Sequence, residues 1–195
     1  AQLASLARKR GNWGDAERLA AIPITVWRHD TGYLGVPGSV ARPIPVVIDN
    51  ASSMYFRPEG ADMVLIGLED DNQMGGSPDR DTTEAASDFR DRAAERIIRR
   101  VPGLIDGTFR TSHSGQDGLT PDQRPMLGAI GPDGFYLDCG HSGTGFKTAP
   151  AVGLGMAELI LDGMATTVDL APFAPGRFAE GRPLVGEHGE EKIWR

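Results

Sequence analysis

Residues 140–150 read GHSGTGFKTAP and are the most informative part of this sequence. They follow a strand-like run at 135–139 and precede a helix-like run at 151–161. A strand that ends in a glycine-rich turn and opens a helix can bind an anion or a cofactor, because unpaired backbone N–H groups point outward there. Lys147 adds a positive charge at the helix entrance. The same glycines also fit an ordinary tight turn, so the turn by itself leaves both interpretations open.

A second motif, TPDQRPMLG, lies upstream at residues 120–128. The order TPD-x-x-P-x-x-G, strand, G-[HF]-S-G-x-G-[FI]-K-x-AP-x-x-G resembles the C-terminal, flavin-facing segment of the D-amino-acid oxidase superfamily. That superfamily includes sarcosine oxidase, glycine oxidase and dimethylglycine dehydrogenase. Residues 54–67 resemble its substrate-domain hairpin and residues 172–183 its C-terminal tail, so the resemblance covers nearly the whole chain. The second block is matched by Gly140, Ser142, Gly143, Gly145, Phe146, Lys147, Ala149, Pro150 and Gly153.

The resemblance and the local patterns together predict an α+β fold. We expect a mostly antiparallel substrate-domain sheet with helices, plus the C-terminal strand-turn-helix of an FAD-binding, Rossmann-like domain. The predicted divisions are the end of the FAD-binding half (1–15), the substrate-binding domain (16–115), a C-terminal return segment of the FAD-binding domain (116–165) and an extended C-terminal tail (166–195).

Hydrophobic periodicity predicts the individual elements. The expected strands lie at 22–33, 46–48 and 107–114, and a hairpin joins 53–57 to 63–68. The expected helices lie at 1–9 and at 82–100, the second capped by Thr82 or Thr83. Residues 69–81 are polar and turn-rich, which predicts a loop. The acidic cluster at 69–71 fits a solvated loop better than a metal site, because no histidine lies near it.

The sequence holds no G-x-G-x-x-G motif, which this superfamily uses to bind the FAD pyrophosphate. Residues 1–11, AQLASLARKRG, resemble the helix that follows the last strand of the dinucleotide half. We therefore expect the C-terminal portion of a larger enzyme, inactive in isolation, with a partner chain supplying the N-terminal FAD-binding half.

The resemblance implies that the glycine turn faces the pyrimidine edge of the flavin. Reduction places negative charge on that edge, and a helix N-terminus stabilises negative charge. Lys147 would add to this effect or bind a substrate carboxylate. The cofactor-binding residues implied by the resemblance are Thr120, Pro121, Gly140, His141, Ser142, Gly143, Thr144, Gly145, Phe146 and Lys147.

The implied reaction is oxidation of a C–N bond of an amine or N-methyl/amino acid by hydride transfer to FAD. The predicted catalytic residues are Lys147, Tyr55 and Arg57. Arg57 is either a bidentate clamp for a substrate carboxylate or the partner of Glu59 or Glu69 in an ion pair. His29 is a further orienting candidate, although His29 and His113 both fit structural roles better. No metal is expected.

Three positions depart from the superfamily pattern. Gly115 stands where sarcosine oxidases carry the cysteine that links the flavin, so FAD is expected to be held non-covalently. Asp117 stands where glycine oxidase carries the arginine for the substrate carboxylate. Its negative charge favours a cationic or polyamine-like substrate, as a hypothesis. Thr144 replaces a histidine of the sarcosine oxidases.

The composition of the chain excludes several classes of function. The net charge of −7 over 195 residues argues against a nucleic-acid partner. No apolar run approaches the roughly 18 residues of a membrane helix. The single cysteine, Cys139, excludes an internal disulfide, fits a reducing cytoplasm, and is expected to be a buried, inert thiol. Two alternatives stay open: a non-catalytic subunit or fragment that binds a partner, and an FAD-dependent 2-hydroxy-acid dehydrogenase on the same scaffold.

Overall fold

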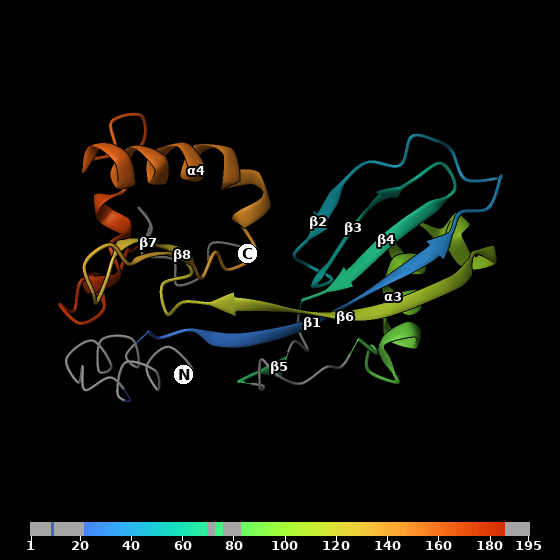
Figure 1. The fold of residues 1–195 in the computed structure, drawn as a ribbon. Helices are drawn as coiled ribbons and strands as arrows, with labels where there is room; N and C mark the ends of the chain where they lie inside the picture. The colour runs from blue at the N-terminus through green and yellow to red at the C-terminus, as the bar shows by residue number, and fades with distance from the viewer. Residues whose placement is uncertain (1–8, 10–21, 70–72, 76–82, 186–195) are drawn as a thin grey trace. The chain divides into compact units, whose positions relative to one another are not determined.

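The computed structural model describes Lys9 and residues 22–69, 73–75 and 83–185. Apart from Lys9, the predicted helix at 1–9 lies outside these residues, as does most of the segment that joins it to the first strand. The chain divides into two units. Unit 1 combines Ala1–Thr25 with Asp117–Arg195, and unit 2 is Val26–Gln116. Figure 1 shows the elements of both.

The sheet of unit 2 has the strand order β2-β3-β4-β1-β5, and β6 pairs with β1 (Figure 1). The four pairings β2–β3, β3–β4, β4–β1 and β1–β5 are antiparallel. The predicted hairpin is confirmed, and its register places Tyr55 opposite Gly67 and Gly67 opposite Thr31. The strands are β1 (Thr25–Gly35), β2 (Val47–Asp49), β3 (Met54–Glu59), β4 (Met63–Leu68), β5 (Gln73–Met74) and β6 (Thr108–Leu119), of which β1 and β6 continue into unit 1.

One helix, α3 (Phe89–Arg100), covers one face of this sheet. Phe89, Ala93 and Ile97 recur every four residues, so they lie on one side of the helix, and all three are buried. They pack in a core with Met54 and Ile66, which lie on the neighbouring strands β3 and β4. A short 3-10 helix, η1 (Pro102–Asp106), follows α3. Every second side chain of β3 and β4 faces this core: Met54, Phe56, Val64, Ile66 and Leu68.

The predicted start of this helix at residue 82 is wrong, and so is the Thr83 cap. The helix begins at Phe89, with Asp88 at the N-cap position. Long-range hydrogen bonds bind the preceding backbone: Ser114 N–H donates to the Thr83 carbonyl (2.9 Å), and Ala86 N–H donates to Asp30 Oδ2 (2.7 Å). These bonds hold residues 83–86 outside helical geometry, although their local pattern is compatible with a helix. The predicted loop at 69–81 also contains strand β5, which pairs with β1 at Trp27 and Arg28.

Unit 1 contains a two-stranded antiparallel sheet and the longest helix of the described residues. The strands are β7 (Met126–Ala129) and β8 (Tyr136–Cys139), and the helix is α4 (Gly145–Asp162). Leu127, Val152, Met156 and Leu170 form a second core. The helix begins six residues before the predicted run at 151–161 and includes Pro150.

The C-terminal segment at 166–195 was predicted to be an extended tail, but its described part is not simply extended. Its described part contains two 3-10 helices, η2 (Ala171–Phe173) and η3 (Pro175–Arg177). Pro172 and Pro175 fix the backbone φ near the value that a tight helical turn requires. The α+β fold class is confirmed: an antiparallel sheet with a covering helix, and a strand, a turn and a helix at the C-terminal side.

Candidate cofactor and substrate surfaces

The glycine turn requires glycine at its first position for two independent reasons. Gly140 has a φ of +70°, a region that side chains other than glycine rarely adopt. A Cβ atom at Gly140 would also lie 2.5 Å from Cγ2 of Thr120. Gly143 has a φ of +82° and is exposed. The turn therefore presents bare backbone to a ligand at Gly143. Gly140 packs on the loop that begins with the TPD motif at residues 120–122, which we call the TPD loop.

Ser142 binds the glycine turn by hydrogen bonds to the segment that leads into the TPD loop. Its φ is +50°, an uncommon backbone for a residue with a side chain, and only 3% of its surface is exposed. Its N–H donates to the Gly118 carbonyl (3.3 Å), and its Oγ accepts from Thr120 N–H (3.3 Å) and donates to the Gly140 carbonyl (3.1 Å). Three hydrogen bonds thus hold the unfavourable backbone in place, as expected where a surrounding structure fixes a strained residue.

Helix α4 starts with an open N-terminus. Thr144 occupies the N-cap position but makes no side-chain cap, because its Oγ1 donates to the His141 carbonyl (2.6 Å). The N–H groups of the first helical turn have no partner inside the helix. Phe146, in that turn, is 99% exposed, and the adjacent Lys147 is also exposed. An uncapped helix start beside a bare glycine fits a flat, anionic group.

His141 is positioned by the end of β8. Its Nε2 lies 2.7 Å from Oδ1 of Asp138, and its Nδ1 is buried without a hydrogen-bond partner. A Cβ atom at Gly145 would lie 3.1 Å from Cβ of His141, so Gly145 lets the first helical turn approach this residue closely. Asp117 lies near the opposite side of the turn, with Oδ2 3.9 Å from the Cβ position of Gly143.

The TPD loop is held by a buried ion pair that sequence reasoning missed. Arg177 donates from Nε to Asp122 Oδ2 (2.8 Å) and from Nη2 to Asp122 Oδ1 (2.9 Å), with both side chains at most 2% exposed. Burial by itself would raise the pKa of Asp122, but hydrogen bonds from Arg177 and from the backbone of Leu184 and Arg124 together hold it below its usual value. The two partners lie 55 residues apart, so local sequence patterns carry no signal for the pair.

Among the predicted cofactor residues of this loop, Thr120 is buried and Pro121 is exposed. The Thr120 hydroxyl donates to the Arg124 carbonyl (2.7 Å), which closes the loop. The structure therefore brings Thr120 together with Gly140 and Ser142, as the prediction of one continuous site requires. Asp122 acts inside the protein, where it joins the loop to the C-terminal segment.

The face of the unit 2 sheet that points away from α3 carries polar and aromatic side chains. The Tyr55 ring covers Gly67: its Cζ and Oη lie 2.1 and 2.3 Å from where a Cβ of Gly67 would stand. Directly opposite residues on paired strands share a face, so Thr31 lies on this face too. Thr31 Oγ1 lies 3.0 Å from His113 Nε2, and the His113 ring stacks on Tyr33 with centroids 5.7 Å apart.

Arg57 and His29, two other residues predicted to orient the substrate, also have defined contacts in this sheet. Arg57 forms an ion pair with Glu59, with Nη1 2.5 Å from Oε2, which is the structural alternative named for Arg57. His29 stacks on Trp27 at 5.3 Å, and its Nε2 lies 3.6 Å from the Cβ position of Gly115. His29 and His113 therefore stand with Tyr55 among the groups that this sheet offers to a ligand.

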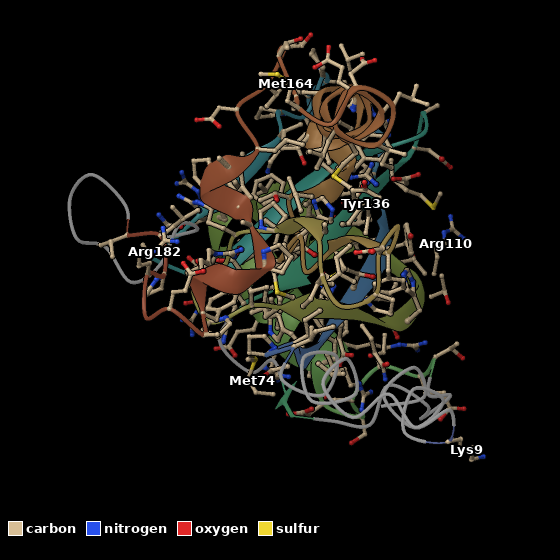
Figure 2. The ribbon with its side chains drawn as sticks, turned by 60° about the vertical axis from the view of Figure 1, so that its left-hand side comes forward. Lys9, Met74, Arg110, Tyr136, Met164 and Arg182 are labelled. Carbon is tan, nitrogen blue, oxygen red and sulfur yellow. The ribbon has the colours of Figure 1, made fainter. Side chains whose placement is uncertain are left out.

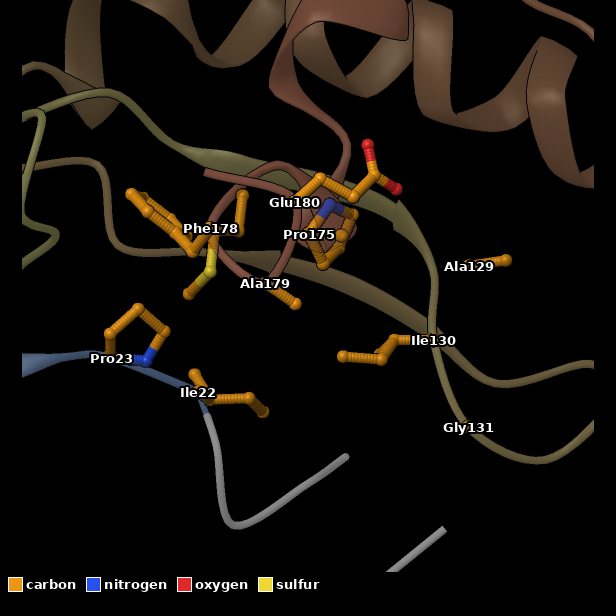
Figure 3. Close-up of a pocket in the computed structure, with 11 residues that line it drawn as sticks. Ile22, Pro23, Ala129, Ile130, Gly131, Pro175, Phe178, Ala179 and Glu180 are labelled. Carbon is orange, nitrogen blue, oxygen red and sulfur yellow. The ribbon is translucent and has the colours of Figure 1, made fainter. Parts of the chain in front are cut away.

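A separate pocket of about 540 Å³ lies in unit 1 and contains none of the predicted site residues. Figure 3 shows Ile22 and Pro23 on one side of it and Ile130 and Ala179 pointing into the same space. Its lining is mostly apolar.

In the part of the chain that the structure describes, no group of three or more metal-ligating side chains occurs. None of the helices described there combines the length and apolar composition of a membrane span.

Cys139, directly before the turn, is half-buried. Burial, together with the nearby Asp138 carboxylate, raises the pKa of its thiol. This agrees with the expectation of an unreactive thiol.

Comparison with known proteins identifies the family. The model for "FAD dependent oxidoreductase" matches residues 13–159. "FAD-dependent oxidoreductase domain-containing protein 1" of Bos taurus is 34% identical over 143 residues, which cover 70% of this chain and 28% of that protein. "Sarcosine oxidase subunit beta" of Rhodobacter capsulatus is 38% identical over 87 residues, covering 45% of this chain and 18% of that protein.

Solved structures share the fold. L-proline dehydrogenase from P. horikoshii aligns with a TM-score of 0.73 and 26% identity, covering 87% of this chain and 44% of that chain. Glycine oxidase from Geobacillus kaustophilus aligns with a TM-score of 0.67 and 22% identity. The chain spans less than half of the length of each of these four proteins. Because the family model covers most of the sequence and the glycine turn lies within it, this chain belongs to the FAD-dependent oxidoreductases of the D-amino-acid oxidase type.

Proposed function

We propose that this chain is the substrate-side part of an FAD-dependent oxidoreductase that oxidises a C–N bond of an amine or amino acid. The observation that carries the proposal is the glycine turn at 140–144, which opens onto the uncapped N-terminus of α4. Relatives support the reaction class, since they include a sarcosine oxidase subunit and an L-proline dehydrogenase.

Bound FAD would supply the hydride acceptor of this reaction. The residues of this chain contribute charge and shape. The N–H groups of Gly145 and Phe146 stand at the positive end of the α4 dipole, where they stabilise a developing negative charge. Lys147 carries a full positive charge in the same turn. Gly143 lets a flat group reach the backbone, because it has no Cβ.

The face of the unit 2 sheet that points away from α3 supplies the orienting groups for the substrate in this proposal. Tyr55 and His113 both present polar atoms from fixed positions, which favours precise placement of a small substrate. Arg57 is engaged by Glu59, so a carboxylate clamp at Arg57 would require that ion pair to open. Together with Asp117 beside the glycine turn, this favours a substrate whose recognised group is a cationic amine.

The FAD pyrophosphate would be held by a nucleotide-binding part with a G-x-G-x-x-G motif, which this sequence does not show. We propose that such a part acts together with this chain, as a partner chain or within a longer polypeptide. FAD is proposed to be non-covalent, because Gly115 has no side chain to link it. Acid precipitation of the yellow protein should then release all flavin into the supernatant.

The decisive experiment measures flavin absorbance and dye reduction with the chain alone, with added FAD, and with the nucleotide-binding part present. The proposal expects colour and amine-dependent dye reduction only in the third sample. A panel of amines, amino acids and 2-hydroxy acids tests the reaction class. Reduction by 2-hydroxy acids alone would establish the hydroxy-acid alternative, and a colourless complex would establish the partner-binding alternative.

Lys147 can be tested in the same assembly. Lys147→Ala should lower kcat/KM by about 10- to 100-fold, because one charge beside the developing anion is removed. Lys147→Arg keeps the charge and should retain most of the activity. Equal turnover and an equal flavin spectrum for Lys147→Ala and the parent would show that Lys147 has no part in the chemistry.

A further inference from the structure

One straight row of side chains crosses the face of the unit 2 sheet that points away from α3. The strand register places Ile48 opposite Tyr55, Tyr55 opposite Gly67, and Gly67 opposite Thr31. Residues directly opposite one another on paired strands share a face, so these four form one row, which we call the cross-sheet row. His113 ends the row, because its Nε2 lies 3.0 Å from Oγ1 of Thr31. The row therefore crosses β2, β3, β4, β1 and β6, which are labelled in Figure 1.

The cross-sheet row changes from apolar to polar along its length. At the β2 end, Ile48 is 57% exposed. Among the described strands β2 is the outermost, a position where natural sheets favour charged residues. At the other end, the Thr31 hydroxyl and the exposed His113 imidazole can accept hydrogen bonds from an amine. Between the two ends, the Tyr55 ring covers Gly67 and presents both a ring surface and a hydroxyl.

The neighbouring row on the same face adds apolar surface and no net charge. Arg57 lies opposite Leu65, and Leu65 lies opposite Tyr33. Leu65 is only 8% exposed, although it lies on the face that points away from α3, so this face already shelters an apolar side chain. The charge of Arg57 is compensated by Glu59. The surroundings of the cross-sheet row therefore fit an uncharged, apolar group better than a carboxylate.

We propose that the cross-sheet row binds an amine whose nitrogen carries a long apolar arm, and that Ile48 determines this specificity. The inference rests on the proposed function and names the substrate class of the same site. The amine lies at Thr31 and His113, and its arm runs over Tyr55 to Ile48. Paired strands lie about 4.8 Å apart, so the three strand steps from Thr31 to Ile48 span about 14 Å. A substrate that reaches both ends is much longer than glycine or sarcosine.

A second exposed apolar side chain lies on the same face, outside the cross-sheet row. Met74, labelled in Figure 2, is 57% exposed and lies opposite Trp27. Trp27 shares the face of Thr31, because residues four apart on a strand point to the same side. The Trp27 ring is stacked on His29 with centroids 5.3 Å apart, so that ring already has a partner. We therefore place the arm at Ile48, and Met74 provides a control on the same face.

A series of amines of increasing length tests the row in the assembled enzyme. Dimethylamine, N-methylbutylamine, N-methylhexylamine and N-methyloctylamine are compared by kcat/KM in dye reduction and by Kd in titration calorimetry. Each added methylene should raise kcat/KM by about threefold, mainly through KM, until the arm reaches Ile48. Ile48→Asn should lower the ratio of kcat/KM for N-methyloctylamine over dimethylamine by at least about tenfold, and Ile48→Leu should retain it. Met74→Asn, and Ile105→Asn at a 66% exposed isoleucine of η1, are the controls and should leave the ratio unchanged.

The outcomes separate this inference from the proposed function. An unchanged ratio in Ile48→Asn, or a length dependence that Met74→Asn abolishes and Ile48→Asn does not, overturns the inference. Oxidation of every amine without dependence on arm length refutes the arm alone and leaves the reaction standing. Amines that bind with the length dependence set by Ile48 but never reduce the dye refute the proposed reaction alone. If no amine binds or reacts, both fail.

Discussion

Replacing Arg177 by methionine removes the cation from the buried ion pair that closes the TPD loop. The Arg177 guanidinium donates to both carboxylate oxygens of Asp122 and to the carbonyls of Phe173 (2.8 Å) and Arg124 (2.9 Å). In Arg177→Met, the Asp122 carboxylate stays buried and keeps mainly its backbone donors, Leu184 N–H (2.9 Å) and Arg124 N–H (3.1 Å).

Breaking a buried ion pair by removing one partner costs about 3–5 kcal/mol, because an uncompensated charge stays in the interior. A cost of about 4 kcal/mol changes the unfolding equilibrium by roughly a thousandfold. With a urea dependence of about 2 kcal/mol per molar, the midpoint falls by about 2 M. Urea unfolding followed by circular dichroism measures this directly.

The control is Arg182→Ala, which removes an exposed ion pair with Glu180. Exposed pairs contribute about 0–1 kcal/mol, so this midpoint should move little. A loss below about 1 kcal/mol for Arg177→Met would show that the Asp122 pair is not buried as described.

Acid provides a second readout of the same pair. The folded pKa of Asp122 lies below its unfolded value of about 3.9, so its contribution is complete above about pH 5. It is lost as the pH falls through the folded pKa. The stability difference between the parent and Arg177→Met should therefore shrink below about pH 4. A difference that stays constant down to pH 2 would contradict this linkage.

Other changes test the turn. Gly140→Ala puts a Cβ 2.5 Å from Cγ2 of Thr120 at a φ of +70°, whereas Gly134→Ala meets no atom within 4 Å at a φ of +79°. Urea unfolding should show Gly134→Ala costing about 1 kcal/mol from backbone strain and Gly140→Ala costing at least about 1 kcal/mol more, and equal losses would contradict the close contact. The Cys139 thiol, whose pKa is raised by burial and by Asp138, should react with iodoacetamide more slowly than glutathione at pH 8, as followed by mass spectrometry. Equal rates would show an exposed thiol.

Several parts of the fold follow from local patterns alone. The hairpin of β3 and β4 was predictable because two strand-like runs flank a turn-forming PEGAD segment. The glycine turn was predictable because its glycines lie between a strand-like run and a helix-like run, and the structure gives Gly140 and Gly143 positive φ. The motifs around them also sufficed to indicate the family, which the match over residues 13–159 confirms.

Other parts depend on contacts between distant residues. The start of α3 at Phe89 is set by hydrogen bonds of the preceding backbone with Ser114 and Asp30, and both residues lie far from residue 83 in the sequence. The role of Asp122 is set by Arg177, 55 residues away. The proximity of Thr31 and His113, 82 residues apart, depends on the pairing of β6 with β1.

The sequence by itself determined the glycine turn, the hairpin and the family, because turn-forming residues and the strand-like runs beside them are properties of neighbouring positions. Only the tertiary structure decided that Asp122 is an internal anchor, that Arg57 is held by Glu59, and that Ile48 and Thr31 lie in one row across the sheet. These outcomes depend on which residues, far apart in the sequence, pack together in the folded chain and shield one another from water. Burial and charge pairing are set by the assembled fold, so the local sequence around each residue does not fix them.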